Sequence, residues 1–185
     1  MRMTGFAGAM GVIIGLGGMA MAETTMFEDF GTGADARWRY IADGVMGGVS
    51  TGGASMALQA SGGGTMRLTG TVSTENNGGF IQVRRTLPDG FPEGTQGLSL
   101  TARGNGETYF VFLRTTELRR PWQYYSATFT PGANWGGANI PLSAFKASHD
   151  FLSQTIDPRA VRSIGLVAYG RDHQADLSVG QIKLY

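Results

Sequence analysis

Apolar and polar residues alternate with a period of two along much of this chain. The segments Thr65-Met-Arg-Leu-Thr-Gly70 and Gly97-Leu-Ser-Leu-Thr-Ala102 show the alternation clearly. Successive side chains of a β-strand point to opposite faces of a sheet, so this pattern predicts strands with one buried face. Glycine makes up 30 of the 185 residues and recurs between these segments, which indicates many turns. These features predict an all-β fold, an antiparallel β-sandwich with little helix.

Individual segments predict a hairpin, a central strand and a bulge. Ser55–Ala60 and Thr65–Gly70 flank a glycine-rich turn and predict a hairpin. Glu107–Arg114 is apolar on both faces, which is typical of a strand in the middle of a sheet. The apolar residues of Asp176–Tyr185 change phase across Gly180, and this change predicts a β-bulge.

The remaining segments predict more strands and two short helical turns. Strands are expected at Gly79–Leu87, Trp122–Thr130 and Val161–Tyr169 because their apolar residues also follow a strand pattern. One or two turns of helix are expected within Ser143–Leu152, and a single turn at Asp157–Ala160. There is no internal repeat and no linker, so we expect one domain.

The first 22 residues have the composition of a secretory signal peptide. Arg2 supplies a positive charge, Phe6–Met21 carries none, and Ala20-Met21-Ala22 fits the small-x-small rule for cleavage. We therefore expect cleavage after Ala22 and a mature domain of residues 23–185 in the periplasm or outside the cell. An uncleaved membrane anchor is the alternative, whereas cleavage would leave no stable membrane insertion.

The composition disfavours several classes of function. The chain has no cysteine, so it has neither a disulfide nor a thiolate metal site. Without Arg2, the 15 Lys and Arg residues become 14 and equal the 14 Asp and Glu residues. A protein that binds nucleic acid needs a basic surface, so no nucleic acid partner is expected. Gly15-Leu-Gly-Gly-Met-Ala20 matches a dinucleotide fingerprint, but the strand and acid that would confirm it do not follow.

Residues for catalysis are few. The two histidines, His149 and His173, lie in polar segments without the spacing of a metal site. Gly48-Val-Ser50-Thr-Gly52 matches G-x-S-x-G, but it leads into a strand and not into the helix that a nucleophile elbow requires. Asp43, Glu75 and Glu107 are candidates for glycoside hydrolysis by residue type alone. We therefore expect no enzyme activity, no cofactor and no metal.

Arginines and aromatic residues gather in the middle of the chain. Arg84-Arg85, Arg114 and Arg119-Arg120 have the forked guanidinium groups that suit carboxylate or phosphate partners, and a solvated strand face is the plainer interpretation. Trp122, Tyr124 and Trp135 are candidates for stacking on a sugar or on a partner side chain. Packing in the core or at its rim is the alternative for these aromatic residues.

Two glycine motifs are the most specific features of the sequence. The first is Asp43-Gly-Val-Met-Gly-Gly-Val-Ser50, and the second is Glu75-Asn-Asn-Gly-Gly-Phe80, followed by Arg84. A hairpin turn accounts for Asn77-Gly78 but leaves the rest of the second motif unexplained. The candidate binding residues are Asp43, Gly44, Met46, Gly47, Gly48, Ser50, Glu75, Asn76, Asn77, Gly78, Gly79, Phe80 and Arg84.

These motifs, with Trp38, Tyr109 and Ile140-Pro-Leu-Ser-Ala-Phe145, closely resemble the complex I intermediate-associated protein 30 family. The resemblance implies a jelly-roll sandwich of the galactose-binding-domain-like type. It also implies a non-catalytic protein-binding module that resembles an assembly factor or chaperone of respiratory complex I, and the signal peptide would place it in the bacterial envelope. A carbohydrate-binding module, with a glycan as the ligand, is the alternative.

The resemblance also suggests that the two glycine motifs lie side by side at one end of the sandwich. Glu75, Asn76 and Asn77 would then hydrogen-bond the exposed amides of the Gly44–Gly48 loop. Arg84 would pair with Glu75 or Asp43. This arrangement is either a structural latch or the floor of a binding site, and both interpretations stay open at the level of sequence.

Overall fold

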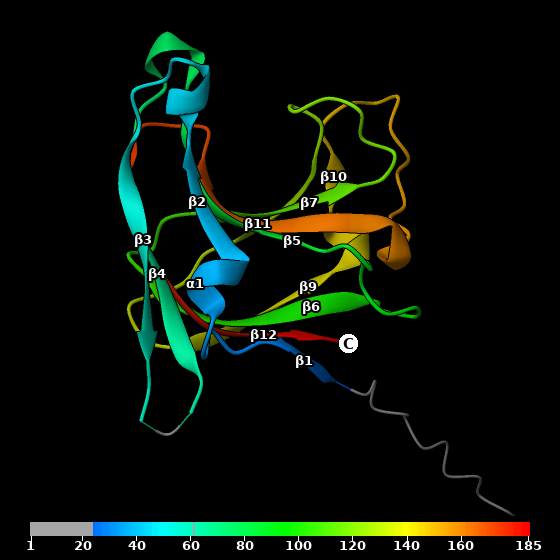
Figure 1. The fold of residues 1–185 in the computed structure, drawn as a ribbon. Helices are drawn as coiled ribbons and strands as arrows, with labels where there is room; N and C mark the ends of the chain where they lie inside the picture. Colours follow the sequence, from blue (N-terminus) through cyan, green and yellow to red (C-terminus); the bar gives the residue numbers. More distant parts are fainter. Residues whose placement is uncertain (1–23, 61) are drawn as a thin grey trace, which may run out of the picture.

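The computed structural model describes residues 24–60 and 62–185, and the expected signal peptide lies outside them. The described part of the chain is mostly strand, with short helical turns between strands (Figure 1). The strands are β1 (Thr25–Glu28), β2 (Trp38–Ala42), β3 (Thr51–Leu58), β4 (Gly64–Val72), β5 (Phe80–Thr86), β6 (Gly97–Gly104), β7 (Tyr109–Thr115), β8 (Tyr125–Phe129), β9 (Gly136–Pro141), β10 (Lys146–Ala147), β11 (Val161–Tyr169) and β12 (His173–Leu184). The helical turns are α1 (Ala34–Arg37), η1 (Asp43–Met46), η2 (Glu75–Asn77), η3 (Leu142–Ala144) and η4 (Pro158–Ala160).

The strands form two antiparallel sheets, which we name after their long strands. The β12 sheet has the order β3-β4-β12-β6-β9, with β1 also paired to β12. The β11 sheet has the order β10-β8-β7-β11-β5-β2. Neighbours in each sheet are often distant in sequence, as in a jelly roll. The structure therefore confirms the predicted all-β jelly-roll sandwich with little helix.

The core lies between the two sheets and is built by alternate residues of the strands. In β7, Tyr109, Val111 and Leu113 are fully buried, whereas Phe110 and Phe112 on the opposite face are half-buried. In β12, Leu177 and Val179 are buried in one phase, and Ile182 is buried in the other. Burial of such apolar side chains is the main stabilising contribution to a fold of this kind.

Several predictions of local structure are confirmed. The segments expected to form a hairpin are β3 and β4, which pair antiparallel from Thr51 with Thr71 to Leu58 with Gly64. β7, expected in the middle of a sheet, lies between β8 and β11. The pairing of β12 with β6 shifts between Val179 and Gln181, which is the bulge expected at Gly180.

Other local predictions are wrong or incomplete. Ser143–Leu152 does not form the expected helix, because η3 ends at Ala144 and the chain then pairs with β8 as β10. The hydroxyl of Ser148 next accepts a hydrogen bond from the backbone of Tyr124, which keeps this segment beside the sheet.

The turn expected at Asp157–Ala160, in contrast, is present as η4, with the Asp157 side chain as its cap.

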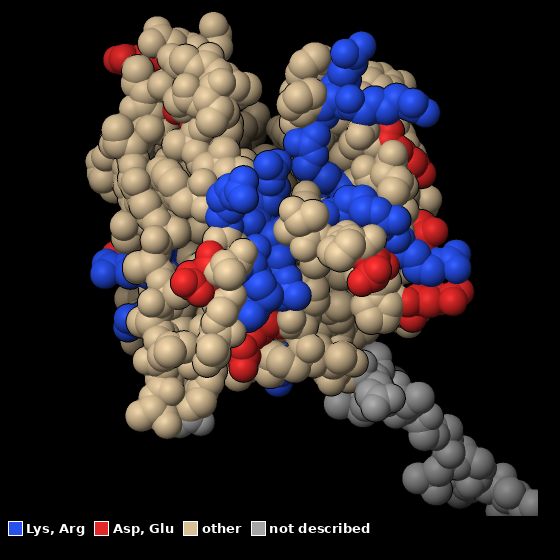
Figure 2. Space-filling view, viewed as in Figure 1, with Lys and Arg blue, Asp and Glu red and all other residues tan. Residues whose placement is uncertain are grey.

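The outer face of the β11 sheet is hollowed. Figure 1 shows this sheet curving upward at both sides, and Figure 2 shows a hollow between two lobes of the molecule. One lobe carries η1 and η2, and we name it the turn lobe. The other carries the segments 116–124 and 148–157, and we name it the loop lobe. We use the name hollow for the outer face of β2, β5, β11, β7 and β8 between these lobes.

Candidate binding hollow and its Asp43 anchor

A buried carboxylate joins the two glycine motifs. Asp43, the first residue of η1, is fully buried. Its oxygens accept hydrogen bonds from the backbone N–H of Ser50 (3.0 Å), Gly79 (2.6 Å) and Phe80 (3.2 Å). The Ser50 hydroxyl donates a further hydrogen bond to Asp43 and accepts one from the backbone N–H of Ser73. We name Asp43 with its donors the Asp43 anchor, and it shows that the motifs lie side by side, as expected.

The anchor explains the unusual composition of the second motif. A Cβ atom at Gly78 would lie 2.5 Å from a carboxylate oxygen of Asp43, so a larger residue does not fit. Gly79 has a φ of 120°, a value that L-residues rarely adopt. Asn76 and Asn77 both adopt the left-handed region, with φ of 55° and 57°, which asparagine tolerates well. The two asparagines and two glycines therefore shape the backbone that presents N–H groups to Asp43.

The hydrogen bonds expected between the two motifs are wrong, because the donor and acceptor groups come from the opposite motifs. The N–H groups of Gly47 and Gly48 already bond the carbonyls of Gly44 and Asp43 within the first motif. The side chains of Glu75, Asn76 and Asn77 are exposed and form no hydrogen bond with any described residue. The acid therefore comes from the first motif and the donors come largely from the backbone of the second.

Hydrogen bonding controls the ionisation of Asp43. Burial by itself would raise the pKa of this carboxyl, because it disfavours the charged form. The hydrogen bonds from Ser50, Gly79 and Phe80 outweigh burial and lower the pKa below its usual value. Asp43 therefore stays ionised. Because it is shielded from solvent and its oxygens are engaged, its role is to hold the two motifs together.

The first motif nevertheless has an exposed tip. Gly44, Met46 and Gly47 are exposed, and so is Val45 between them. This tip belongs to the turn lobe beside the hollow (Figure 1). The structure thus divides the first motif into two parts: Asp43, Gly48 and Ser50 build the anchor, and residues 44–47 form a surface.

Four aromatic residues cover part of the floor of the hollow. Phe112 of β7 stacks on Tyr124, with ring centroids 4.1 Å apart and an interplanar angle of 8°. The hydroxyl of Tyr124 donates a hydrogen bond of 3.2 Å to the hydroxyl of Tyr169. Phe110 packs edge-on against Tyr169. Burial and the bond to Tyr169 raise the pKa of Tyr124. One face of Phe112 and one face of Tyr124 are therefore covered by the other ring.

The three aromatic residues proposed for stacking do not form one platform. Tyr124 belongs to the hollow, and Trp122 is exposed on the loop lobe, with the Arg120 guanidinium 5.9 Å from its ring centroid. Trp135 lies on the β12 sheet instead, next to the bulge at Gly180 and with Arg103 5.2 Å from its ring centroid. The indole ring of Trp135 therefore packs directly over Gly180.

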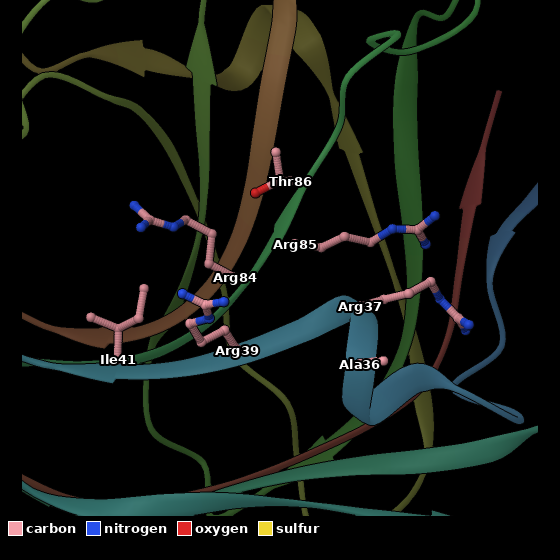
Figure 3. Close-up of a pocket in the computed structure, with 7 residues that line it drawn as sticks. All are labelled: Ala36, Arg37, Arg39, Ile41, Arg84, Arg85 and Thr86. Atoms are coloured by element: carbon pink, nitrogen blue, oxygen red, sulfur yellow. The ribbon is translucent and has the colours of Figure 1, made fainter.

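Four arginines line a cavity of about 400 Å³ at the edge of the hollow, together with Ala36, Ile41 and Thr86 (Figure 3). Arg37 and Arg85 extend to one side, where each pairs with Glu28 at 2.7 Å. Arg39 and Arg84 extend to the other side, toward Ile41 (Figure 3). The side chains of Arg39 and Arg84 form no hydrogen bond or ion pair with any described residue. The expected pairing of Arg84 with Glu75 or Asp43 is therefore wrong.

Glu28 is a second buried carboxylate, and no sequence pattern indicates its role. Besides the two arginines, it accepts hydrogen bonds from the indole N–H of Trp38 and the backbone N–H of Phe30, both at 2.9 Å. Burial would raise the pKa of Glu28, but its hydrogen bonds, above all with Arg37, lower it below its usual value. Glu28 thus fastens β1 to β2 and β5.

The serine and the two histidines considered for catalysis form contacts with other groups. The hydroxyl of Ser50 hydrogen-bonds Asp43 and Ser73, whereas His149 contacts Ser148 and His173 contacts the carbonyl of Arg171. In residues 24–60 and 62–185, no three His, Cys, Asp or Glu side chains are grouped to hold a metal ion. The same ranges contain no helix that is long and apolar enough to cross a membrane.

The two sheets and their shared core define a jelly-roll β-sandwich domain. The sequence identifies the group within that class, because the sequence model of the complex I intermediate-associated protein 30 family matches residues 28–183. The chain belongs to this family, as the two glycine motifs led us to expect. A comparison with curated protein sequences gives no match.

Solved carbohydrate-binding modules share the fold. The family 11 module of the cellulosomal cellulase Lic26A-Cel5E of Clostridium thermocellum has a TM-score of 0.70 and 19% identity, over 89% of this chain and 95% of that chain. A family 11 module from the same organism, in complex with a beta-1,3-1,4-mixed-linked tetrasaccharide, has a TM-score of 0.68 and 20% identity, over 87% and 94%. A family 30 module has a TM-score of 0.55 and 16% identity, over 88% and 98%. At these identities the likeness concerns the fold alone.

Proposed function

We propose that this chain is a non-catalytic binding module that holds a segment of a partner protein in the hollow of the β11 sheet. The observation that carries the proposal is the exposure of large apolar side chains on both lobes. Val45 and Met46 on the turn lobe are 75% and 63% exposed, and Trp122 and Phe151 on the loop lobe are 59% and 74% exposed. Exposed apolar side chains that gather around a concavity are typical of a surface that a protein partner covers.

Family membership supports a protein partner. The family is named for association with intermediates of complex I, so we propose that the chain acts as an assembly factor or chaperone. With the signal peptide expected at residues 1–22, that action would take place in the bacterial envelope on a respiratory or other envelope component. Both the family and the carbohydrate-binding modules are non-catalytic types of domain, which agrees with a binding role.

A glycan is the second candidate ligand, because solved carbohydrate-binding modules share the fold and the hollow contains aromatic residues. Sugar binding of this kind requires an aromatic ring with a free face. Phe112 and Tyr124 each cover one face of the other, Trp122 lies on the loop lobe, and Trp135 lies on the β12 sheet, so these rings do not form one stacking platform. This arrangement favours the protein partner.

The proposal is tested by replacing exposed apolar side chains on both lobes with serine. The double variant Met46→Ser, Trp122→Ser alters both lobes, and Leu58→Ser alters an equally exposed apolar residue of the β3–β4 hairpin, away from the hollow. Each tagged protein is purified from the envelope of its own host, and bound proteins are quantified by mass spectrometry. We expect a specific protein to be retained by the wild type and by Leu58→Ser and lost from the double variant, since a buried Trp is often a binding hot spot.

The same proteins are also tested on a glycan array. Equal retention of all proteins by the three forms would contradict the proposal. Glycan binding that is lost in Tyr124→Ala, without a retained protein, would favour the carbohydrate-binding alternative.

A further inference from the structure

Two arginines with no partner stand side by side in the hollow. Arg39 of β2 and Arg84 of β5 are directly opposite each other in the antiparallel pairing, on the outer face of the sheet. Like charges at such positions repel and destabilise the pair of strands. Within the described ranges, no carboxylate, carbonyl or hydroxyl bonds either guanidinium group. The fold therefore tolerates a local repulsion that it does not compensate.

The neighbouring arginines show that the chain supplies an acid where arginine has a structural role. Arg37 and Arg85 line the same cavity but turn away from Arg39 and Arg84 (Figure 3), and both bind the buried Glu28. Figure 2 shows Lys and Arg side chains gathered near the centre of the viewed side of the molecule, below the hollow. Arg39 and Arg84 therefore differ from Arg37 and Arg85, because their guanidinium N–H groups are free to bind an external anion.

The strand pairing places an aromatic residue across the sheet from the arginine pair. Arg84 lies opposite Gly165 of β11, and Gly165 lies opposite Phe112 of β7. Gly165 has no side chain, but it is buried, because the amide oxygen of Gln82 and a methyl group of Val167 lie 3.0 and 3.5 Å from the position that its Cβ atom would take. Neighbouring strands are about 4.8 Å apart, so the positions of Arg84 and Phe112 are separated by roughly 10 Å.

A third guanidinium adds to the positive potential. The Arg114 side chain donates hydrogen bonds of 2.6 Å to the carbonyls of Pro121 and Arg120, so it is held in place without a carboxylate. Burial, and then the charge of Arg84, lower the pKa of Arg114. Arg84 therefore has positive charge on both sides, from Arg39 and from Arg114.

We infer that Arg39 and Arg84 form a carboxylate-binding subsite for an acidic residue of the partner segment. This inference rests on the proposed function, and it specifies the chemistry of the partner. Guanidinium forks bind carboxylates with two parallel hydrogen bonds, which a lysine pair does not do. An extended chain spans roughly 10 Å in three residues, so an apolar or aromatic residue three positions from the acid would contact Phe112. The partner motif is therefore an Asp or Glu with an apolar residue three positions before or after it.

The inference is tested with a displayed library of random peptides, selected on residues 23–185 in dilute buffer. The expected selected sequences contain this motif. The strongest one is synthesised together with its Glu→Gln or Asp→Asn counterpart, and both are titrated by calorimetry. We expect the acidic peptide to bind about tenfold more tightly than its neutral counterpart, and Arg39→Gln and Arg84→Gln each to weaken it about tenfold. Arg103→Gln, an exposed arginine of the β12 sheet, is the matched control and should leave binding unchanged.

The outcomes separate this inference from the proposed function. If selected peptides bind in the hollow but lack an acid, or ignore Arg39→Gln and Arg84→Gln, the carboxylate subsite is wrong and the protein-binding function stands. If no peptide is selected, both the subsite for an acidic partner segment and the protein-binding function are wrong. Binding of an oligogalacturonate that depends on Arg84 would then assign the two arginines to an acidic glycan.

A stability measurement excludes a structural role for the pair. Because the two like charges repel in the free protein, Arg39→Gln and Arg84→Gln should leave the thermal midpoint unchanged or raise it. Weaker peptide binding without loss of stability supports the subsite. A lower midpoint in both variants would show that the arginines stabilise the fold and would overturn the inference.

Discussion

The backbone N–H of Gly79 donates a hydrogen bond of 2.6 Å to the carboxylate of Asp43, 36 residues earlier in the chain. This bond closes the Asp43 anchor and joins the loop after β2 to the turn before β5. Since β2 and β5 are themselves neighbours in the β11 sheet, the anchor fixes the end of the sheet beside the hollow. The exposed tip of the first motif is thereby held at a defined place on the turn lobe.

Replacement of Asp43 by alanine should destabilise the fold strongly. The change leaves the buried N–H groups of Gly79 and Ser50 without an acceptor, and each such group costs about 1–3 kcal/mol. We expect the free energy of unfolding, measured by urea denaturation, to fall by at least about 3 kcal/mol. Glu75→Ala is the control, because the exposed carboxylate of Glu75 accepts no hydrogen bond from any described residue. Equal losses in the two variants would contradict the anchor.

Alanine at Gly78 should be harmful, whereas alanine at Gly44 should not. The added Cβ atom at Gly78 would meet the Asp43 carboxylate at 2.5 Å and push the two motifs apart. At Gly44 no atom lies within 4 Å of an added Cβ, and φ is not positive. We expect a loss of about 2–4 kcal/mol for Gly78→Ala and a change within about 0.5 kcal/mol for Gly44→Ala. Similar thermal midpoints for both variants would contradict the close packing at Gly78.

Stability should fall at acid pH because of two buried carboxyls. The folded-state pKa values of Asp43 and Glu28 are lowered, so both stabilise the fold fully above their unfolded-state pKa, near 4. This contribution is lost as the pH falls through the folded-state values. Urea denaturation between pH 7 and pH 2.5 should show a decline that is smaller in Asp43→Asn and in Glu28→Gln. A decline of the same size in both variants would show that other groups cause it.

Cleavage of the expected signal peptide can be tested on the native protein by intact mass spectrometry of separated cell fractions. We expect a periplasmic or secreted species that begins at Glu23, because Ala20-Met21-Ala22 precedes it. A full-length species in the membrane or cytoplasm would contradict cleavage and would move the proposed assembly role to another compartment.

Much of the fold was predictable because its signals are local. Strict alternation predicted β4 and β6, and the phase change predicted the bulge at Gly180. β9 was missed because Gly136 and Gly137 at its start carry no side chains to show alternation. β2 was missed because Tyr40-Ile41-Ala42 is an apolar run that does not alternate with polar residues.

The candidate site was predictable in part. The two glycine motifs were expected to meet, but sequence does not show which polar side chain is buried, so Glu75 was chosen in place of Asp43. The Glu28 network joins residues 9 and 57 positions apart, and no local pattern marks such a contact. Arg39 and Arg84 become neighbours only through the register of β2 with β5, which the sequence does not state.

The claim that the hollow is the binding face can be tested most directly by crosslinking in the native host. A photoreactive residue is placed at Thr128, which is exposed beside Phe110 in the hollow, or at Thr101, which is exposed on the outer face of the β12 sheet. We predict a discrete protein adduct from position 128, absent from position 101 and lost on adding Met46→Ser and Trp122→Ser. An adduct from position 101 alone, or the same adducts from both positions, would contradict a binding site in the hollow.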